Sequence, residues 1–174
     1  MKIPFIDLKR QHDPISKELE QALFSSLNSM QYIEGPNVKE LEKKCQTYLD
    51  VEYAITCGNG TDSLRLALQA AGVGFGDEVI TTAFSFFATA EAIASVGAVP
   101  IFIDIFKGDY NIDYTKIEEK ITDKTKAILP VHIFGYPAEM DEICAIAKKH
   151  NLSVIEDACQ AIGAKYKGKD GSEN

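Results

Sequence analysis

The fold is constrained most by a regular alternation between short apolar runs and longer stretches with helical periodicity. Runs rich in β-branched and aromatic residues predict strands, which we place at residues 51–56, 77–82, 99–104, 126–131 and 152–157. The stretches 86–96 and 137–150 carry apolar residues at helical spacing. Apolar strands that alternate with amphipathic helices are typical of a parallel sheet covered on both faces. The sequence therefore predicts an α/β fold, a three-layer α/β/α sandwich around a mostly parallel sheet.

Two helices are expected before the first predicted strand. Asp13 has the features of an N-cap, with Pro14 at the first helical position and an apolar stripe behind it. Gly35 and Pro36 open a second helix that runs to about residue 49. Further along the chain, Asp113 is expected to cap a short helix.

Composition and charge exclude several classes of protein. A chain of 174 residues can bury a core as one domain. A net charge of -8 argues against nucleic acid or an anionic membrane as partner. The four cysteines have no Cys-x-x-Cys spacing and no partnered histidine cluster, so no metal site is expected. With no secretion signal, and with the longest apolar run broken by Gly97 and Pro100, a cytoplasmic protein is predicted.

A glycine-containing turn at residues 57–63 joins the first predicted strand to a helix. Bare amides at a helix start suit a phosphate, and Gly58 and Gly60 allow the backbone to approach a ligand closely. Because Asn, Thr and Asp all favour helix starts, an ordinary capped turn is an equally good interpretation. The dinucleotide fingerprint is not met, since Ser63 stands where its third glycine would be.

Other candidates follow the predicted strands, because ligands of parallel sheets gather outside the carboxyl ends of the strands. Asp157 ends an apolar strand, where a carboxylate is costly without a cationic partner, and a protonated pyridine nitrogen is one such partner. From the residues alone the favoured interpretation is structural: Asp157 caps the next turn or pairs with a lysine. Phe86 could stack on a flat ring, whereas Phe84 and Phe87 are expected in the core. His132 is interpreted as a structural histidine at a turn. Glu156 and Asp157 should point to opposite faces, which argues against a glycosidase pair.

Seven segments, taken in this order, resemble one known family of enzymes. They are Ile6-Asp7-Leu8, Ile33-Glu34-Gly35-Pro36, residues 60–68, residues 76–80, residues 84–90, Val131-His132-Ile133-Phe134-Gly135 and residues 156–161. Together they resemble the sugar aminotransferases of the DegT/StrS type, which depend on pyridoxal 5'-phosphate (PLP) and have fold-type I. The resemblance runs from Ile3 to about Gly171.

The resemblance implies a role for particular residues. Gly60, Thr61 and Asp62 would hold the PLP phosphate, and Phe86 would stack on the pyridine ring. Asp157 would pair with the ring nitrogen and keep it protonated, and Gln160 would hydrogen-bond the ring hydroxyl. By the same resemblance, residues 1–174 are the N-terminal part of the PLP-binding large domain, without the small C-terminal domain. No catalytic residue is assigned, because the Schiff-base lysine of the family is expected beyond Asn174.

The resemblance also implies substrates and partners. The complete enzyme would move an amino group from an amino acid, commonly glutamate, onto a keto group of a nucleotide-linked sugar, and would act as a homodimer. Three alternatives stay open. The first is a related PLP-dependent sugar dehydratase, in which histidine replaces the lysine. The second is a non-catalytic binding or regulatory protein, and the third is a nucleotide-binding Rossmann module.

Overall fold

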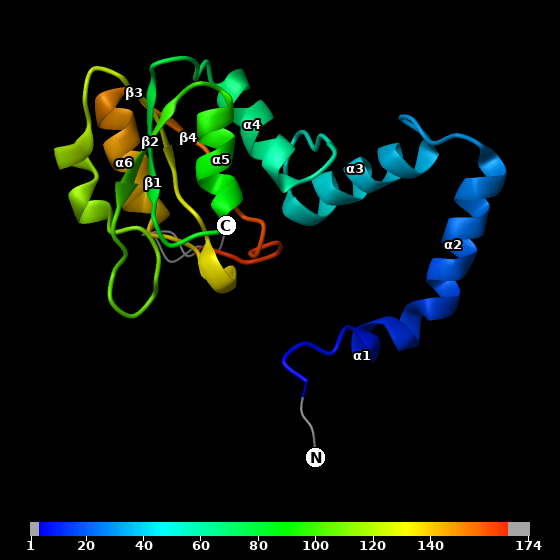
Figure 1. The fold of residues 1–174 in the computed structure, drawn as a ribbon. Coiled ribbons are helices and arrows are strands. Elements are labelled where there is room, and N and C mark those ends of the chain that lie inside the picture. The colour runs from blue at the N-terminus through cyan, green and yellow to red at the C-terminus, as the bar shows by residue number, and fades with distance from the viewer. Residues whose placement is uncertain (1–3, 167–174) are drawn as a thin grey trace. The chain divides into compact units, whose positions relative to one another are not determined.

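The computed structural model describes residues 4–166, which fall into two compact units that divide between Thr56 and Cys57. The first unit is helical and the second contains the sheet (Figure 1). Within the described residues no helix is long and apolar enough to cross a membrane.

The sheet of the second unit has four parallel strands in the order β2-β1-β3-β4. They are β1 (Glu78–Thr82), β2 (Val99–Ile103), β3 (Thr125–Leu129) and β4 (Ser153–Val154). The predicted strand at 152–157 is shorter than expected, but an isolated bridge between Val131 and Asp157 continues the pairing of β3 with β4. The predicted parallel sheet is confirmed.

Helices cover both faces of this sheet. The second unit has three α-helices, α4 (Gly60–Ala70), α5 (Phe87–Ser95) and α6 (Met140–His150), among its described residues. It also has short 3-10 turns η2 (Tyr114–Lys116), η3 (Glu118–Lys120) and η4 (Ile133–Gly135). Figure 1 shows α4 and α5 together on one face and α6 on the other. The helix capped by Asp113 is therefore a pair of 3-10 turns, and the helix expected from Pro137 begins at Met140.

Side chains of the central strands alternate between two apolar cores. Val79 packs with Leu68 of α4 and Ile93 of α5 on one face. Its neighbour Ile80 packs with Ile143 of α6 on the other face. Because successive strand residues point to opposite faces, a strand covered on both sides directs apolar side chains toward both of them. This is the physical basis of the three-layer sandwich that the sequence predicts.

The first unit consists of α1 (Leu8–His12), the 3-10 turn η1 (Asp13–Ile15), α2 (Ser16–Ser29) and α3 (Pro36–Leu49). Gly35 and Pro36 open α3 as predicted. The prediction of Asp13 as an N-cap is wrong, because helical turns already precede it and Asp7 caps α1 by accepting from the Arg10 amide at 3.2 Å. Neither α2 nor α3 contains a buried residue.

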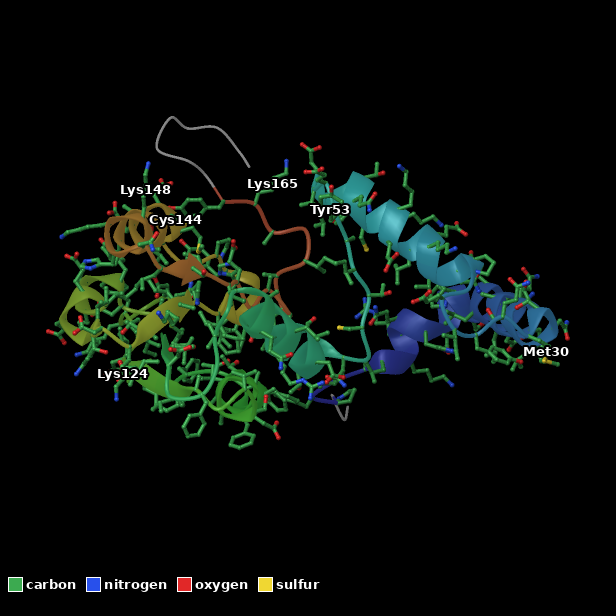
Figure 2. All side chains as sticks on the ribbon, turned by 90° about the horizontal axis from the view of Figure 1, so that it is seen from above. Met30, Tyr53, Lys124, Cys144, Lys148 and Lys165 are labelled. Carbon is green, nitrogen blue, oxygen red and sulfur yellow. The ribbon has the colours of Figure 1, made fainter. Side chains whose placement is uncertain are left out.

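The strand predicted at residues 51–56 is also absent. No described strand pairs with this segment, and a β-strand is defined by the neighbour that accepts and donates its backbone hydrogen bonds. Ile55 and Tyr53 are exposed, the latter labelled in Figure 2. The Thr56 amide donates not to a strand but to the Glu42 carboxylate, at 2.9 Å.

Candidate functional site

The turn before α4 presents free amides at the start of the helix. Asn59 caps α4, since its Oδ1 accepts from the Asp62 amide at 2.9 Å and its Nδ2 donates to Asp62 Oδ2 at 3.1 Å. The Ser63 amide donates to the Asn59 carbonyl at 3.0 Å. Within residues 4–166 the amides of Gly60 and Thr61 have no acceptor. The cap and the anion site are therefore compatible, because the cap leaves these two donors for a ligand.

Gly60 brings this turn against the segment that follows β4. A Cβ atom at Gly60 would lie 3.1 Å from Cys159 Sγ, tighter than nearly all real contacts of that kind. Glycine is therefore favoured at position 60, because a side chain there would crowd the Cys159 sulfur. The contact places the start of α4 beside residues 157–160, more than ninety residues later in the sequence.

Asp157 lies at the carboxyl end of the sheet with its carboxylate largely buried. The residue is 7% exposed. Its backbone is fixed on both sides, because its amide donates to the Pro130 carbonyl at 2.9 Å and its carbonyl accepts from the His132 amide at 3.0 Å. Oδ2 accepts from Thr89 Oγ1 at 2.9 Å, and Oδ1 accepts from the Cys159 amide at 3.3 Å.

No cation partners this carboxylate in the part of the chain that the structure describes. The ion pairs there involve other acids, and the donors that meet Asp157 are a hydroxyl, an amide and a thiol. The lysine pairing left open by the sequence is thus not seen there, whereas the other structural alternative, a cap of the next turn, matches the hydrogen bond from the Cys159 amide to Asp157 Oδ1. A buried carboxylate without a countercharge is costly, and a cationic ligand group would remove that cost.

Cys159 is electrostatically tied to Asp157. Its hydrogen bond to the Asp157 carboxylate, together with partial burial and the negative charge, raises the pKa of the Cys159 thiol to about 11. The thiol therefore stays protonated near neutral pH and acts as a donor, so it is a poor candidate for a nucleophile.

Phe86 lies at the N-cap of α5, and 79% of it is exposed. Within the described residues its ring makes no contact with another aromatic ring. The prediction that Phe84 and Phe87 are core residues is wrong, because they are 42% and 73% exposed. Phe84 instead packs beside the rings of Tyr110 and Phe134, at centroid distances of 5.5 and 6.2 Å.

Gln160 stabilises the turn η4 through its side chain. Its Oε1 accepts from the Phe134 amide at 2.7 Å. Phe134 has a φ of 56°, a left-handed conformation that an aromatic residue adopts only when surrounding contacts support it. With its oxygen engaged, Gln160 retains the side-chain amide hydrogens for a ligand.

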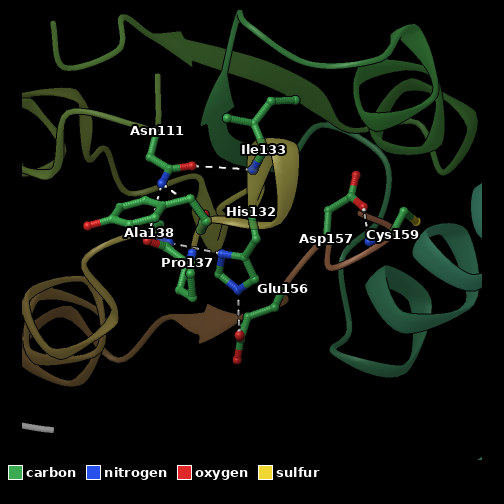
Figure 3. Close-up of polar contacts among 9 residues, drawn as sticks. Asn111, His132, Ile133, Pro137, Ala138, Glu156, Asp157 and Cys159 are labelled. Atoms are coloured by element: carbon green, nitrogen blue, oxygen red, sulfur yellow. Dashed lines mark hydrogen bonds and ion pairs between the residues drawn. The ribbon is translucent and has the colours of Figure 1, made fainter. Parts of the chain in front are cut away.

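His132 is a structural histidine, as interpreted from the sequence. Its Nδ1 accepts from the Ala138 amide at 3.1 Å, so Nε2 carries the proton and donates to Glu156 Oε2 at 2.7 Å (Figure 3). The hydrogen bond to His132 lowers the pKa of Glu156. Figure 3 shows the Glu156 and Asp157 side chains diverging, as expected for neighbours on extended backbone.

Asn111 and Thr89, to which the sequence analysis gave no role, also organise this edge, together with Ser85 of the candidate segment 84–87. Asn111, 2% exposed, donates from Nδ2 to the carbonyls of Tyr136 and Pro137 and accepts at Oδ1 from the Ile133 amide (Figure 3). Thr89 bonds Asp157, and Ser85 bonds Thr89. A lone Asn in a loop or Thr in a helix carries no sequence signal of such contacts.

Three lysines follow Asp157 in the sequence, and the structure describes the first of them. Lys165 is exposed on the segment that follows Gln160, and Figure 2 labels it. Lys167 and Lys169 lie outside the described residues. The expected position of the Schiff-base lysine, beyond Asn174, is outside the sequence as well.

A known protein family matches most of the chain. The DegT/DnrJ/EryC1/StrS aminotransferase family matches residues 13–173. The chain belongs to this family. Residues 57–63, 84–90 and 156–161 all fall inside the matched region.

Relatives and solved structures agree with that membership. Over 169 residues the chain is 52% identical to a pleiotropic regulatory protein of Geobacillus stearothermophilus, covering 97% of the chain and 45% of the relative. Over 167 residues it is 47% identical to the UDP-2-acetamido-2-deoxy-3-oxo-D-glucuronate aminotransferase of Pseudomonas aeruginosa, covering 96% and 46%. The crystal structure of NtdA from Bacillus subtilis with bound cofactor PMP superposes with a TM-score of 0.90 at 42% identity, covering 93% and 38%. The chain thus spans about half the length of the curated relatives it matches.

Proposed function

We propose that the chain is the N-terminal part of the PLP-binding large domain of a sugar aminotransferase. The observation that carries the proposal is the buried carboxylate of Asp157, which no cation partners within the described residues, together with the amides of Gly60 and Thr61, which have no acceptor there. Gly60 approaches Cys159, two residues after Asp157. A ligand with a protonated ring nitrogen and a phosphate satisfies both features at once. When bound, such a cofactor supplies an electron sink for bond breaking at the carbon that carries nitrogen.

Each side chain has a distinct part in holding the cofactor. The amides of Gly60 and Thr61 and the Thr61 hydroxyl donate to the phosphate. The resemblance also assigns Asp62 to the phosphate. Because its amide is already bonded to Asn59 and its carboxylate lies 3.4 Å from the Arg65 guanidinium, we propose that it supports the phosphate site by shaping the turn. Asp157 would hold a proton on the ring nitrogen, and the protonated ring would act as an electron sink.

Two side chains orient the ring. The exposed face of Phe86 stacks on it, and offset stacking of flat rings adds about 1 kcal/mol beyond the area buried. The free amide hydrogens of Gln160 donate to the ring hydroxyl while the Phe134 amide holds its oxygen. These contacts would hold the ring in one orientation.

The reaction we assign to the complete protein is amino transfer from an amino acid, with glutamate as the proposed donor, to a keto group of a nucleotide-linked sugar. The name of the Pseudomonas aeruginosa relative, a sugar-nucleotide aminotransferase, supports this substrate class. A homodimeric, cytoplasmic enzyme is part of the same proposal. The proton shuttle belongs to the family lysine, which we place after Asn174 in the complete protein.

Amino transfer is tested with the complete gene product. Incubation with glutamate and a nucleotide-linked keto sugar is expected to yield 2-oxoglutarate and the amino sugar in equal amounts, measured by chromatography. The gene sequence beyond the codon for Asn174 gives an independent test. A lysine in a serine-containing motif supports amino transfer, whereas a histidine there or failure to form 2-oxoglutarate contradicts it.

A regulatory role is the second candidate, and one observation favours it. The relative that is 52% identical is named as a pleiotropic regulatory protein. A purely regulatory protein has no need of a cofactor. Tight binding of pyridoxamine 5'-phosphate (PMP) by the 174-residue chain would therefore favour the enzyme, and absence of binding would favour the regulator.

A further inference from the structure

A chain of hydroxyl groups leads from the start of α5 to Asp157. Thr89 Oγ1 lies 2.9 Å from Asp157 Oδ2, and Ser85 Oγ lies 2.8 Å from Thr89 Oγ1. An ionised carboxylate can only accept, so the single hydroxyl hydrogen of Thr89 is directed at Asp157. Ser85 must then donate to Thr89, and all hydrogens of the chain point toward the carboxylate.

The position of Thr89 favours a fixed geometry. Thr89 is 2% exposed, so water does not compete for its hydroxyl. Its amide donates to the Phe86 carbonyl at 3.1 Å, which anchors it in the first turn of α5. A β-branched side chain in a helix has few χ1 rotamers, and the Ser85 hydroxyl four residues earlier supports this one.

Each oxygen of the Asp157 carboxylate accepts a hydrogen bond that limits its orientation. Oδ2 meets Thr89, and Oδ1 meets the Cys159 amide at 3.3 Å. The plane of the carboxylate is set by these contacts, which come from α5 and from the segment after β4. Without Thr89 the Oδ1 contact remains, and the carboxylate can turn about its χ2 torsion.

We propose that Thr89, oriented by Ser85, is a positioning residue that directs the Asp157 carboxylate at the ring nitrogen of the cofactor. This inference rests on the proposed PLP site and deepens it. Thr89 touches no cofactor atom in this account; it acts through Asp157. Its effect should therefore depend on the ring nitrogen, and a merely structural threonine would affect all ligands of the site equally.

The test is calorimetric titration of the 174-residue chain with PMP and with its 1-deaza analogue, in which C–H replaces the ring nitrogen. Thr89→Val keeps the shape and removes the hydroxyl, and it is expected to weaken PMP about tenfold, the size of one hydrogen bond to a charged group. Affinity for the deaza analogue should stay within about twofold, because the analogue has no ring nitrogen for Asp157 to contact. Thr89→Ser should restore PMP binding.

Thr81→Val is the matched control. Thr81 is a fully buried threonine of the same unit whose hydroxyl donates to the Leu129 carbonyl at 2.7 Å. Thr81→Val should lower the melting temperature and leave the affinities for PMP and for the deaza analogue unchanged. Ser85→Ala, at a partly buried position, should weaken PMP alone by about threefold and decides the question if Thr89→Val does not fold.

The outcomes distinguish the positioning role of Thr89 from the existence of the cofactor site. Equal losses for PMP and the deaza analogue in Thr89→Val, or no loss in Ser85→Ala, would overturn the positioning role while leaving the cofactor site intact. No binding of PMP by the unsubstituted chain would overturn the proposed site, and with it this inference. Loss confined to PMP, with recovery in Thr89→Ser, supports both.

Discussion

At the scale of single residues, the site depends on how Asp157 is surrounded. Its neighbours donate hydrogen bonds, and none of those described carries a positive charge. Hydrogen bonds to a carboxylate are stabilising, but they do not replace a countercharge in a partly buried position. The negative charge of Asp157 in turn affects the groups that donate to it, and it raises the pKa of the Cys159 thiol.

Cys159 should be unreactive although its residue is exposed. A thiol with a pKa of about 11 is thiolate in only about 0.1% of molecules near pH 8, and the thiolate is the nucleophile. Alkylation by iodoacetamide, followed by peptide mass spectrometry, is expected to be slow there and to rise steeply as the pH approaches about 11. Asp157→Asn should accelerate it, since the carboxylate is the main cause of the raised pKa. Labelling of Cys159 at the rate of a small free thiol would contradict this assignment.

At the scale of elements, His132 joins the end of β3 to the segment before α6 and to Glu156. Its two ring nitrogens satisfy the Ala138 amide and the Glu156 carboxylate. His132 is 5% exposed, so removing its ring leaves the buried Ala138 amide without an acceptor. These contacts hold β3, β4 and the start of α6 in one arrangement.

His132→Ala should therefore destabilise the second unit by about 2 kcal/mol or more, measured as the free energy of unfolding in urea. Asn111→Ala should have a similar effect, because it frees three backbone groups of residues 133–137. His12→Ala is the control: this exposed histidine, in the first unit, should have little effect. Equal effects of the three substitutions would contradict the bridging role of His132.

Glu156 gives this contact a pH dependence. The hydrogen bond to His132 lowers its pKa from 4.5, so the contact stabilises the fold above that value and is lost as the pH falls through the lower folded pKa. Glu156→Gln should lower the melting temperature most near neutral pH, and the difference should shrink as the pH falls below the ordinary carboxyl pKa of 4.5. The half-exposed position of Glu156 keeps the effect small. A difference that grows in acid would have the wrong sign.

Sequence patterns were sufficient for the elements of the sheet and for several residues at its edge. Apolar runs located the strands because both faces are covered, and the turn before α4 was recognisable from Gly58 and Gly60. The position of Asp157 at the end of an apolar strand was predictable, but the pattern alone favoured a structural role, and the cofactor role came from the family resemblance. Asn111 and Thr89 were not predictable, since their partners lie 22 to 68 residues away and only the tertiary structure brings them together. The strand expected at 51–56 failed for a related reason, because strand propensity alone supplies no partner.

At the scale of the whole chain, the two units differ in how they are stabilised. The second has apolar cores on both faces of its sheet, whereas α2 and α3 of the first have no buried residue. Helices of this length are marginal in water when no apolar face is packed. Leu23, Phe24 and Leu27 of α2 are all exposed by 46% or more.

Hydrogen exchange measured by mass spectrometry should show this difference. Amides of α2 and α3 in the 174-residue chain are expected to exchange at least about a hundredfold faster than those of β1 and β3, because local opening there breaks no buried contact. Both sets lie in the same sample, so the strands are the internal control. Equal protection of α2 and β1 would show that α2 is packed in solution.

The central claim is that Asp157 receives the ring nitrogen of a PLP-type cofactor. Titration of the chain with PMP, followed by calorimetry, tests it most directly when Asp157→Asn is compared with Glu156→Gln, the neighbouring carboxylate whose side chain points away. Asp157→Asn should weaken PMP by at least about tenfold, the loss expected when one charge-assisted hydrogen bond is removed, while Glu156→Gln binds as the unsubstituted chain does. Unchanged affinity in Asp157→Asn, or an equal loss in both variants, would contradict the account.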